Sequence, residues 1–87
     1  MVVAPPAAGR AHDAVRQGLR LLVKSAALEL GAEDIRVNIV LPGSAGGPLG
    51  APASPDEIAA SVAFAASSRA RFMTGADLVV DAGASAL

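Results

Sequence analysis

Two side chains near the beginning of this 87-residue chain could carry acid–base chemistry, His12 and Arg16. A spacing of four residues would place both side chains on one face of a helix. Histidine can act as a general acid near neutral pH. Arginine is effectively always protonated, so it supplies a fixed charge and cannot join a proton relay. The alternative, which we favour, is a solvated pair in the first turn of a helix.

The composition excludes several kinds of site. The chain has no cysteine, no tyrosine and one histidine, which rules out disulfides, a thiolate nucleophile and Cys- or His-based zinc clusters. A net charge of −1 without a basic cluster argues against nucleic-acid binding. No apolar run approaches the roughly 20 residues that span a bilayer, and residues 1–8 lack the pattern of a signal peptide. We expect a cytoplasmic protein with no metal site, no nucleic-acid partner and no membrane association.

The longest helical pattern, which must position His12 and Arg16, covers residues 9–31 with Gly31 as a natural C-cap. One apolar stripe consists of Val15, Leu19, Leu22, Val23, Ala26 and Leu30. A second stripe of smaller side chains consists of Ala14, Gly18, Leu21, Ser25 and Leu28, and the remaining polar arc holds Arg16, Gln17, Arg20 and Lys24. The pattern predicts a helix covered on two sides. An ordinary buried helix explains the first stripe alone, and the second favours contact with a helix of another subunit.

Three strands and a second helix complete the pattern. Residues 1–4 could form a short strand that Pro5-Pro6 breaks. Residues 35–41 have the pattern of an interior strand that ends at Pro42-Gly43. Residues 78–80 have the pattern of a short buried strand. Residues 44–53 should be loop, and Ser54-Pro55-Asp56-Glu57 should open a helix with a capping box that runs to about residue 68. This alternation predicts parallel strands joined by right-handed crossovers in one small domain.

Two stretches resemble the short-chain dehydrogenase/reductase family. The first is residues 25–30 (SAALEL) with 35–43 (IRVNIVLPG), and the second is residues 54–59 (SPDEIA) with 72–83 (FMTGADLVVDAG). Both are collinear with the C-terminal portion of that family. The resemblance implies an α/β fold, namely a partial Rossmann-like three-layer fold with the last two or three parallel strands and their crossover helices. Residues 1–87 would then be a truncated domain without the glycine turn that binds cofactor phosphates.

The resemblance also assigns roles to the candidate residues. The family's catalytic tyrosine and lysine correspond to His12 and Arg16, so both residue types have changed. The segment that lies against the nicotinamide of NAD or NADP corresponds to Pro42, Gly43, Ser44 and Gly47. Gly47 stands where the family often has a threonine, and the loop before Ser54 is shorter than the family's lid over the substrate.

Three functions remain open at this point. The chain could be part of an NAD(P)-dependent oxidoreductase. This function requires that a longer enzyme or a partner chain supply the missing nucleotide-binding half. It could instead be a non-catalytic relative, a pseudoenzyme, that forms dimers, or a truncated remnant of an enzyme. A hydrophobic content of 53% on so short a chain favours contact with another protein. We therefore expect a homo-oligomer, or pairing with another chain of this family, through the helix at residues 12–30.

Overall fold

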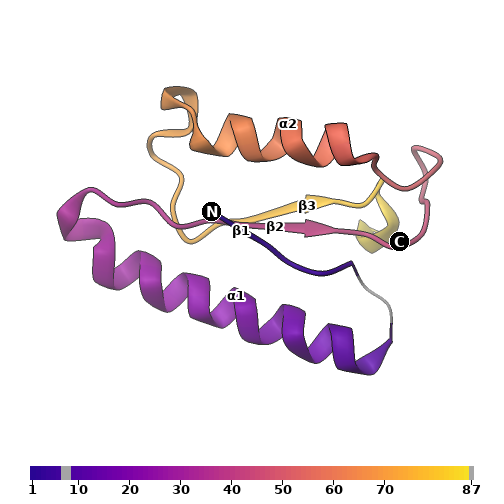
Figure 1. Ribbon diagram of the computed structural model, residues 1–87, viewed down its shortest axis with the longest axis horizontal. Coiled ribbons are helices and arrows are strands. Elements are labelled where there is room, and N and C mark those ends of the chain that lie inside the picture. The colour runs from indigo at the N-terminus through magenta and orange to yellow at the C-terminus, as the bar shows by residue number, and fades with distance from the viewer. Residues whose placement is uncertain (7–8, 87) are drawn as a thin grey trace.

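A computed structural model describes residues 1–6 and 9–86 as three parallel strands between two helices (Figure 1). The strands and helices are β1 (Val2–Val3), α1 (Arg10–Leu30), β2 (Ile39–Pro42), α2 (Pro55–Ala66) and β3 (Asp77–Val80). Short 3-10 turns follow α1, α2 and β3, at Gly31–Glu33, Ser68–Ala70 and Ala84–Ala86. The predicted three-layer α/β arrangement is confirmed, and each predicted strand is present.

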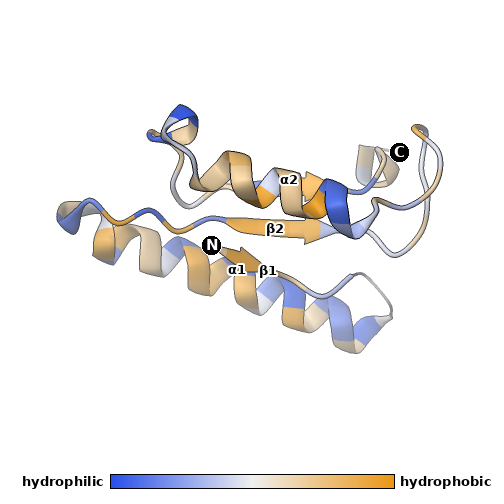
Figure 2. Cartoon of the chain, turned by 45° about the horizontal axis from the view of Figure 1, so that its top comes forward, coloured by the Kyte–Doolittle hydropathy of each residue, from blue (hydrophilic) through white to orange (hydrophobic). Residues whose placement is uncertain are grey.

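The central strand, β2, provides most of the core. The strand order is β1-β2-β3, with Val40 opposite Val3 on one side and Leu78 on the other. Ile39 and Val40 are completely buried because β2 is paired on both edges and covered on both faces. Figure 2 shows this hydrophobic strand between the two helices. The core cluster comprises Ala4, Val23, Ile39 and Leu41, with Val2, Leu19 and Val37 packed against it.

The two crossovers have opposite hands. The strands are parallel and lie in chain order, yet α1 covers one face of the sheet and α2 covers the other (Figures 1 and 2). The crossover through α1 is right-handed, but the one through α2 is left-handed, so the prediction was wrong for α2, against a rule that holds in about 98% of cases. The reason is that α1 already reaches over β3, where Arg20 and Lys24 bond to Asp77 and Gly75. The long connection at residues 43–54 lets the chain pass to the opposite face.

The central strand begins later than predicted, at Ile39 instead of residue 35. Residues 37 and 38 bond to the segment that precedes β3, and Asn38 also bonds to β1, through its carbonyl, which accepts from the Val2 N–H. The backbone N–H of Val37 donates to Thr74 Oγ1, and the buried Asn38 side chain donates to the Met73 carbonyl and accepts from the Ala76 N–H. These bonds satisfy a buried amide and fix where β2 and β3 start.

The helix ends agree with the sequence at α2 and differ at α1. Ser54 and Glu57 form the predicted capping box, in which each side chain accepts from the other's backbone N–H. Gly31 follows α1 but has ordinary right-handed helical geometry, and the left-handed position falls on Asp34 (φ 61°) after one more turn. Asp34 can take this conformation because Asn and Asp tolerate it best among non-glycine residues.

The buried face of α1 also differs from the predicted stripe. Val23 and Ala27 are buried, but Leu22 is 63% exposed, and Val15 is exposed as well. Arg16 and Arg20, which were assigned to the outer polar arc, are half-buried and reach the sheet. The helix is therefore turned so that its arginines meet polar groups of the strands. Across the described residues, no helix combines the length and apolar character needed to cross a membrane.

Candidate functional site: the strand-end crevice

The carboxyl ends of the parallel strands form the candidate site. The chain leaves β1 toward α1 on one face and leaves β2 toward α2 on the other (Figure 1). Connections that diverge in this way open a crevice between two strand ends, and open α/β sheets bind their ligands in such crevices. The ends of β1, β2 and β3 lead into Pro5, Gly43 and Asp81, respectively.

Arg16 lies across this crevice. Its Nη1 donates to the Pro5 carbonyl at 2.8 Å and to the Pro42 carbonyl at 2.6 Å. The structure thus brings one predicted catalytic position, Arg16, to the predicted cofactor segment at Pro42-Gly43. His12 lies one helical turn earlier in α1 and is exposed.

The two glycines of the predicted cofactor segment pack against the chain's own C-terminal turn, which we define as residues 81–86. A Cβ on Gly43 would lie 2.8 Å from the Asp81 Cβ, and a Cβ on Gly47 would lie 2.7 Å from the Ala82 carbonyl oxygen. The backbone N–H of Leu49 also donates to the Ala82 carbonyl at 2.9 Å. Glycine is therefore required at both positions by contacts inside this chain.

Asp81 organises the C-terminal turn, a role that the sequence analysis did not predict. Its Oδ1 accepts from the Gly83 N–H at 3.0 Å, and its Oδ2 accepts from the Ser85 N–H at 2.9 Å. Hydrogen bonds from the Ser85 hydroxyl, and then from the Ser85 backbone, hold the pKa of Asp81 below its usual value. An Asp two residues before a Gly is a turn signal that could have predicted this.

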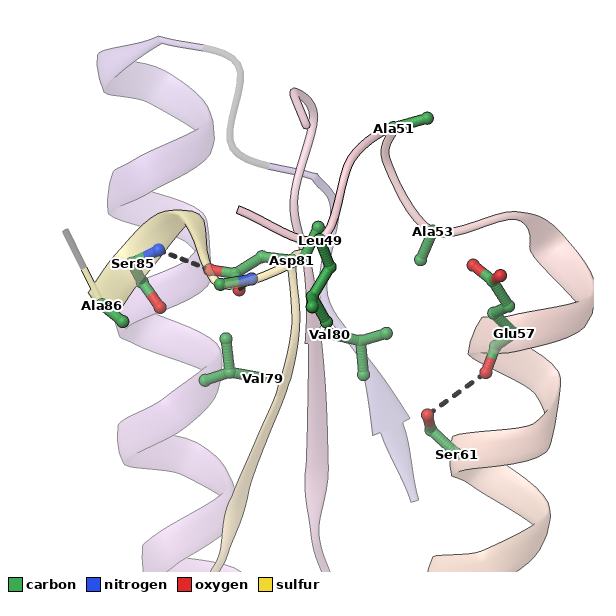
Figure 3. A pocket seen from close by; sticks show the side chains of 12 residues that line it. Leu49, Ala51, Ala53, Glu57, Ser61, Val79, Val80, Asp81, Ser85 and Ala86 are labelled. Atoms are coloured by element: carbon green, nitrogen blue, oxygen red, sulfur yellow. Dashed lines mark hydrogen bonds between the residues drawn. The ribbon is translucent and has the colours of Figure 1, made fainter. Parts of the chain in front are cut away.

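Three hollows surround the strand ends. Two adjoin Arg16: one of about 340 Å³, which Gly43, Ser44 and Ala45 also line, and one of about 240 Å³, which Arg20 and Asp77 also line. The third, of about 630 Å³, lies between α2 and the end of β3 (Figure 3). Its lining is mostly Ala, Leu and Val. Of its polar residues, Glu57 and Ser61 are bonded within α2 and its cap, and Asp81 and Ser85 are bonded to each other in the C-terminal turn.

An ion pair fixes α1 over β3 beside the crevice. Arg20 donates to Asp77 Oδ2 from Nε at 3.0 Å and from Nη2 at 2.7 Å, so two charge-assisted bonds converge on one carboxylate oxygen. Lys24 Nζ lies 3.6 Å from Asp77 Oδ1, close enough for attraction but long for a hydrogen bond. The hydrogen bonds from Arg20 are the main cause that lowers the pKa of Asp77, against a smaller opposing effect of burial. Within the described part of the chain, no group of three or more acidic or histidine side chains could hold a metal ion.

The comparisons with known proteins agree with this fold and with the resemblance of the two sequence stretches. Residues 44–85 match the family model described as "Enoyl-(Acyl carrier protein) reductase". Trans-4-hydroxycyclohexanecarboxylate dehydrogenase of Sinomonas cyclohexanicum is 38% identical, over 87% of this chain and 34% of its own length. L-rhamnose 1-dehydrogenase (NAD(P)(+)) of Azotobacter vinelandii is 36% identical, over 83% of this chain and 36% of its own.

A solved structure gives the same relationship. An oxidoreductase of the short-chain dehydrogenase/reductase family from Burkholderia thailandensis superposes with a TM-score of 0.83 and 33% identity, over 88% of this chain and 39% of that one. The chain therefore belongs to the short-chain dehydrogenase/reductase family and corresponds to its C-terminal portion. It spans about a third of the length of the curated relatives that it matches.

Proposed function

We propose that this chain supplies the strand-end and interface portion of an oxidoreductase-like protein and is not catalytic by itself. The proposal rests on the residue types and contacts of His12 and Arg16, the two positions that correspond to the family's catalytic pair. The chain has no tyrosine that could act as proton donor. Arg16, at the lysine position, directs a guanidinium nitrogen to two carbonyls of its own backbone. His12 would have to serve as the acid without the lysine that the family uses.

We infer that the nicotinamide cofactor of the family, NAD or NADP, has little access to the crevice as this chain forms it. A nucleotide at Pro42, Gly43, Ser44 and Gly47 would need to approach the backbone of both glycines. On the side where a Cβ would lie, each glycine packs against residues 81–84, and the Arg16 side chain crosses the strand ends. We infer that tight binding of either nucleotide by this chain alone is disfavoured. A cytoplasmic location remains a prediction from the sequence.

Binding and turnover of the purified chain test the first proposal. Titration with NADH and with NADPH, followed by calorimetry and by nicotinamide fluorescence, should give no saturation in the micromolar range. A panel of aldehydes and ketones should give no oxidation of either nucleotide. A dissociation constant of about one micromolar, or steady hydride transfer, would contradict the proposal. An intact enzyme of the family, run in parallel, confirms that the assays detect both properties.

A second candidate function, a dimerising interaction module, is favoured by the exposed face of α1. Leu21 is 69% exposed and Leu28 is 86% exposed, and both belong to the stripe predicted to meet another subunit. A Cβ added at Gly18 would meet no atom within 4 Å, so another helix could approach the backbone there. Such an apolar face on a surface helix is typical of an interaction site. We propose self-association through this face.

The mass of the chain in solution tests this second candidate. Leu21→Asp or Gly18→Glu should convert an oligomer to a monomer in light scattering, because each places a charge on the contact face without touching the core. The helical circular-dichroism signal should stay unchanged. Leu49→Asp is the matched control, since Leu49 is also highly exposed but lies in the loop before α2. A monomeric wild-type chain, or variants with unchanged mass, would contradict the proposal.

A further inference from the structure

Prolines remove hydrogen-bond donors from the ends of β1 and β2. Pro5 and Pro6 come shortly after β1, and Pro42 is the last residue of β2. A proline has a carbonyl but no backbone N–H, so it can accept in a ladder and cannot donate. The N–H groups of Val2 and Ala4 donate to the carbonyls of residues 38 and 40, both at 2.9 Å. Since alternate residues of a strand face the same neighbour, the next donor toward β2 would come from Pro6, which has no N–H. These strand ends therefore hold more acceptors than donors.

Arg16 supplies a donor from outside the sheet. A single nitrogen, Nη1, bonds to the carbonyls of both Pro5 and Pro42, which are on different strands. Bonds from a charged donor are shorter and roughly twice as strong as neutral ones. The Arg16 side chain is only partly accessible to solvent, which strengthens such bonds further. One side chain of α1 thus joins the end of β1 to the end of β2.

The joint lies where the chain leaves the sheet in two directions. Between β1 and β2 the backbone diverges toward α1 and toward α2 (Figure 1), which is where an open α/β sheet would admit a ligand. The two hollows at this point, of about 340 Å³ and about 240 Å³, share Arg16, Asp81 and Ser85 in their walls. Both carboxylate oxygens of Asp81 accept hydrogen bonds from backbone N–H groups of its own turn. The Arg16 guanidinium instead donates to the carbonyls at the strand ends.

We propose that Arg16 is a positioning residue, a strap that closes the strand-end crevice and holds the proline-terminated end of β1 onto β2. The strap does not depend on whether the chain is catalytic, because it involves only groups of this chain. It implies that β1 is the strand most dependent on a single side chain. The β2–β3 ladder, by contrast, continues past Pro42 through the Gly43 N–H, which donates to the Val80 carbonyl.

Hydrogen exchange of single amides tests the strap. In Arg16→Met the Ala4 N–H should exchange about tenfold to a hundredfold faster, the change expected when hydrogen bonds to a charged group are lost. The Gly43 N–H should change much less, because its bond lies on the other side of β2. Arg16→Lys keeps a positive donor but loses the planar guanidinium, so its Ala4 exchange should fall between wild type and Arg16→Met. Arg69→Met, at an exposed arginine in Ser68–Ala70, is the matched control and should change neither amide.

Chemical rescue separates a strap from general destabilisation. In Arg16→Ala, methylguanidinium should slow Ala4 exchange again by filling the vacated place, whereas methylammonium at the same concentration should do so less well. Unchanged Ala4 exchange in Arg16→Met, equal acceleration at Ala4 and Gly43, or no rescue by methylguanidinium would each overturn the proposal. The measurement uses neither nucleotide nor partner, so its outcome is independent of the activity and association tests above.

Discussion

At the scale of single residues, charged side chains of this protein bond mainly to its own backbone and to one another. Arg36 is a second example beside Arg16, since its guanidinium donates to the carbonyls of Ala65, Ala70 and Met73. It thus joins the last turn of α2, at Ala65, to the segment that follows the helix. The backbone contacts of these two arginines cannot be read from the sequence, because an arginine between apolar residues is compatible with a solvated surface position.

Asp77 gives a pH-dependent prediction at the same scale. Its pKa in the folded chain lies below the ordinary value because of hydrogen bonds from Arg20, so its stabilising effect is present above about pH 4 and is lost as the pH falls further. Asp77→Asn should lower the free energy of unfolding at pH 7 by about 0.5–1 kcal/mol, the range for a partly exposed pair. The difference from wild type should shrink toward zero near pH 2, as measured by urea unfolding across pH.

An exposed carboxylate provides the control for this prediction. Glu33→Gln, in the turn after α1, changes the same net charge at an exposed position and should leave the urea midpoint at pH 7 nearly unchanged. An Asp77→Asn difference that stays constant from pH 7 to the acid limit would show that the ion pair is not its source.

At the scale of elements, the start of α2 is determined locally and gives a second stability prediction. Ser54 Oγ accepts from the Glu57 N–H at 3.2 Å, and the Ser54 N–H donates to Glu57 Oε2 at 2.9 Å. Ser54→Ala should cost about 1 kcal/mol in thermal or urea unfolding, the usual effect of losing an N-cap. Ser61→Ala, in the same helix, removes a hydroxyl that bonds only to the Glu57 carbonyl and should change stability little. Equal effects of the two substitutions would argue against the cap.

At the scale of the whole molecule, the arrangement of the helices decides which surfaces remain exposed. The left-handed crossover places α2 on the face opposite α1 (Figure 2), so α1 covers its face of the small sheet without a neighbouring helix. Its second stripe, with Leu21 and Leu28, is consequently exposed. An exposed apolar helix on a domain with so small a core is the physical reason to expect association, and the Leu21→Asp and Gly18→Glu variants test that expectation.

The sequence by itself determined the order of the elements, their approximate bounds and the family. Local signals are sufficient for these, as with the Ser54 capping box, the continuous apolar run of β2 and the two collinear signatures. The resemblance also assigned Arg16 to the family's lysine position and Pro42-Gly43 to the segment against the nicotinamide. What periodicity could not predict is the direction in which α1 faces, since a helix with apolar residues around most of its circumference has several nearly equivalent orientations.

Only the tertiary structure decided that orientation and its consequences for the site. Burial of Val23, the pairing of Arg20 with Asp77 and the bonds from Arg16 to Pro5 and Pro42 all require groups far apart in the sequence. The same long-range contacts explain the left-handed crossover and the packing of Gly43 and Gly47 on the turn at Asp81. The residue types at His12 and Arg16 can thus be read from the chain. The contacts of Arg16 cannot, because the ends of β1 and β2 meet the α1 side chain only after folding.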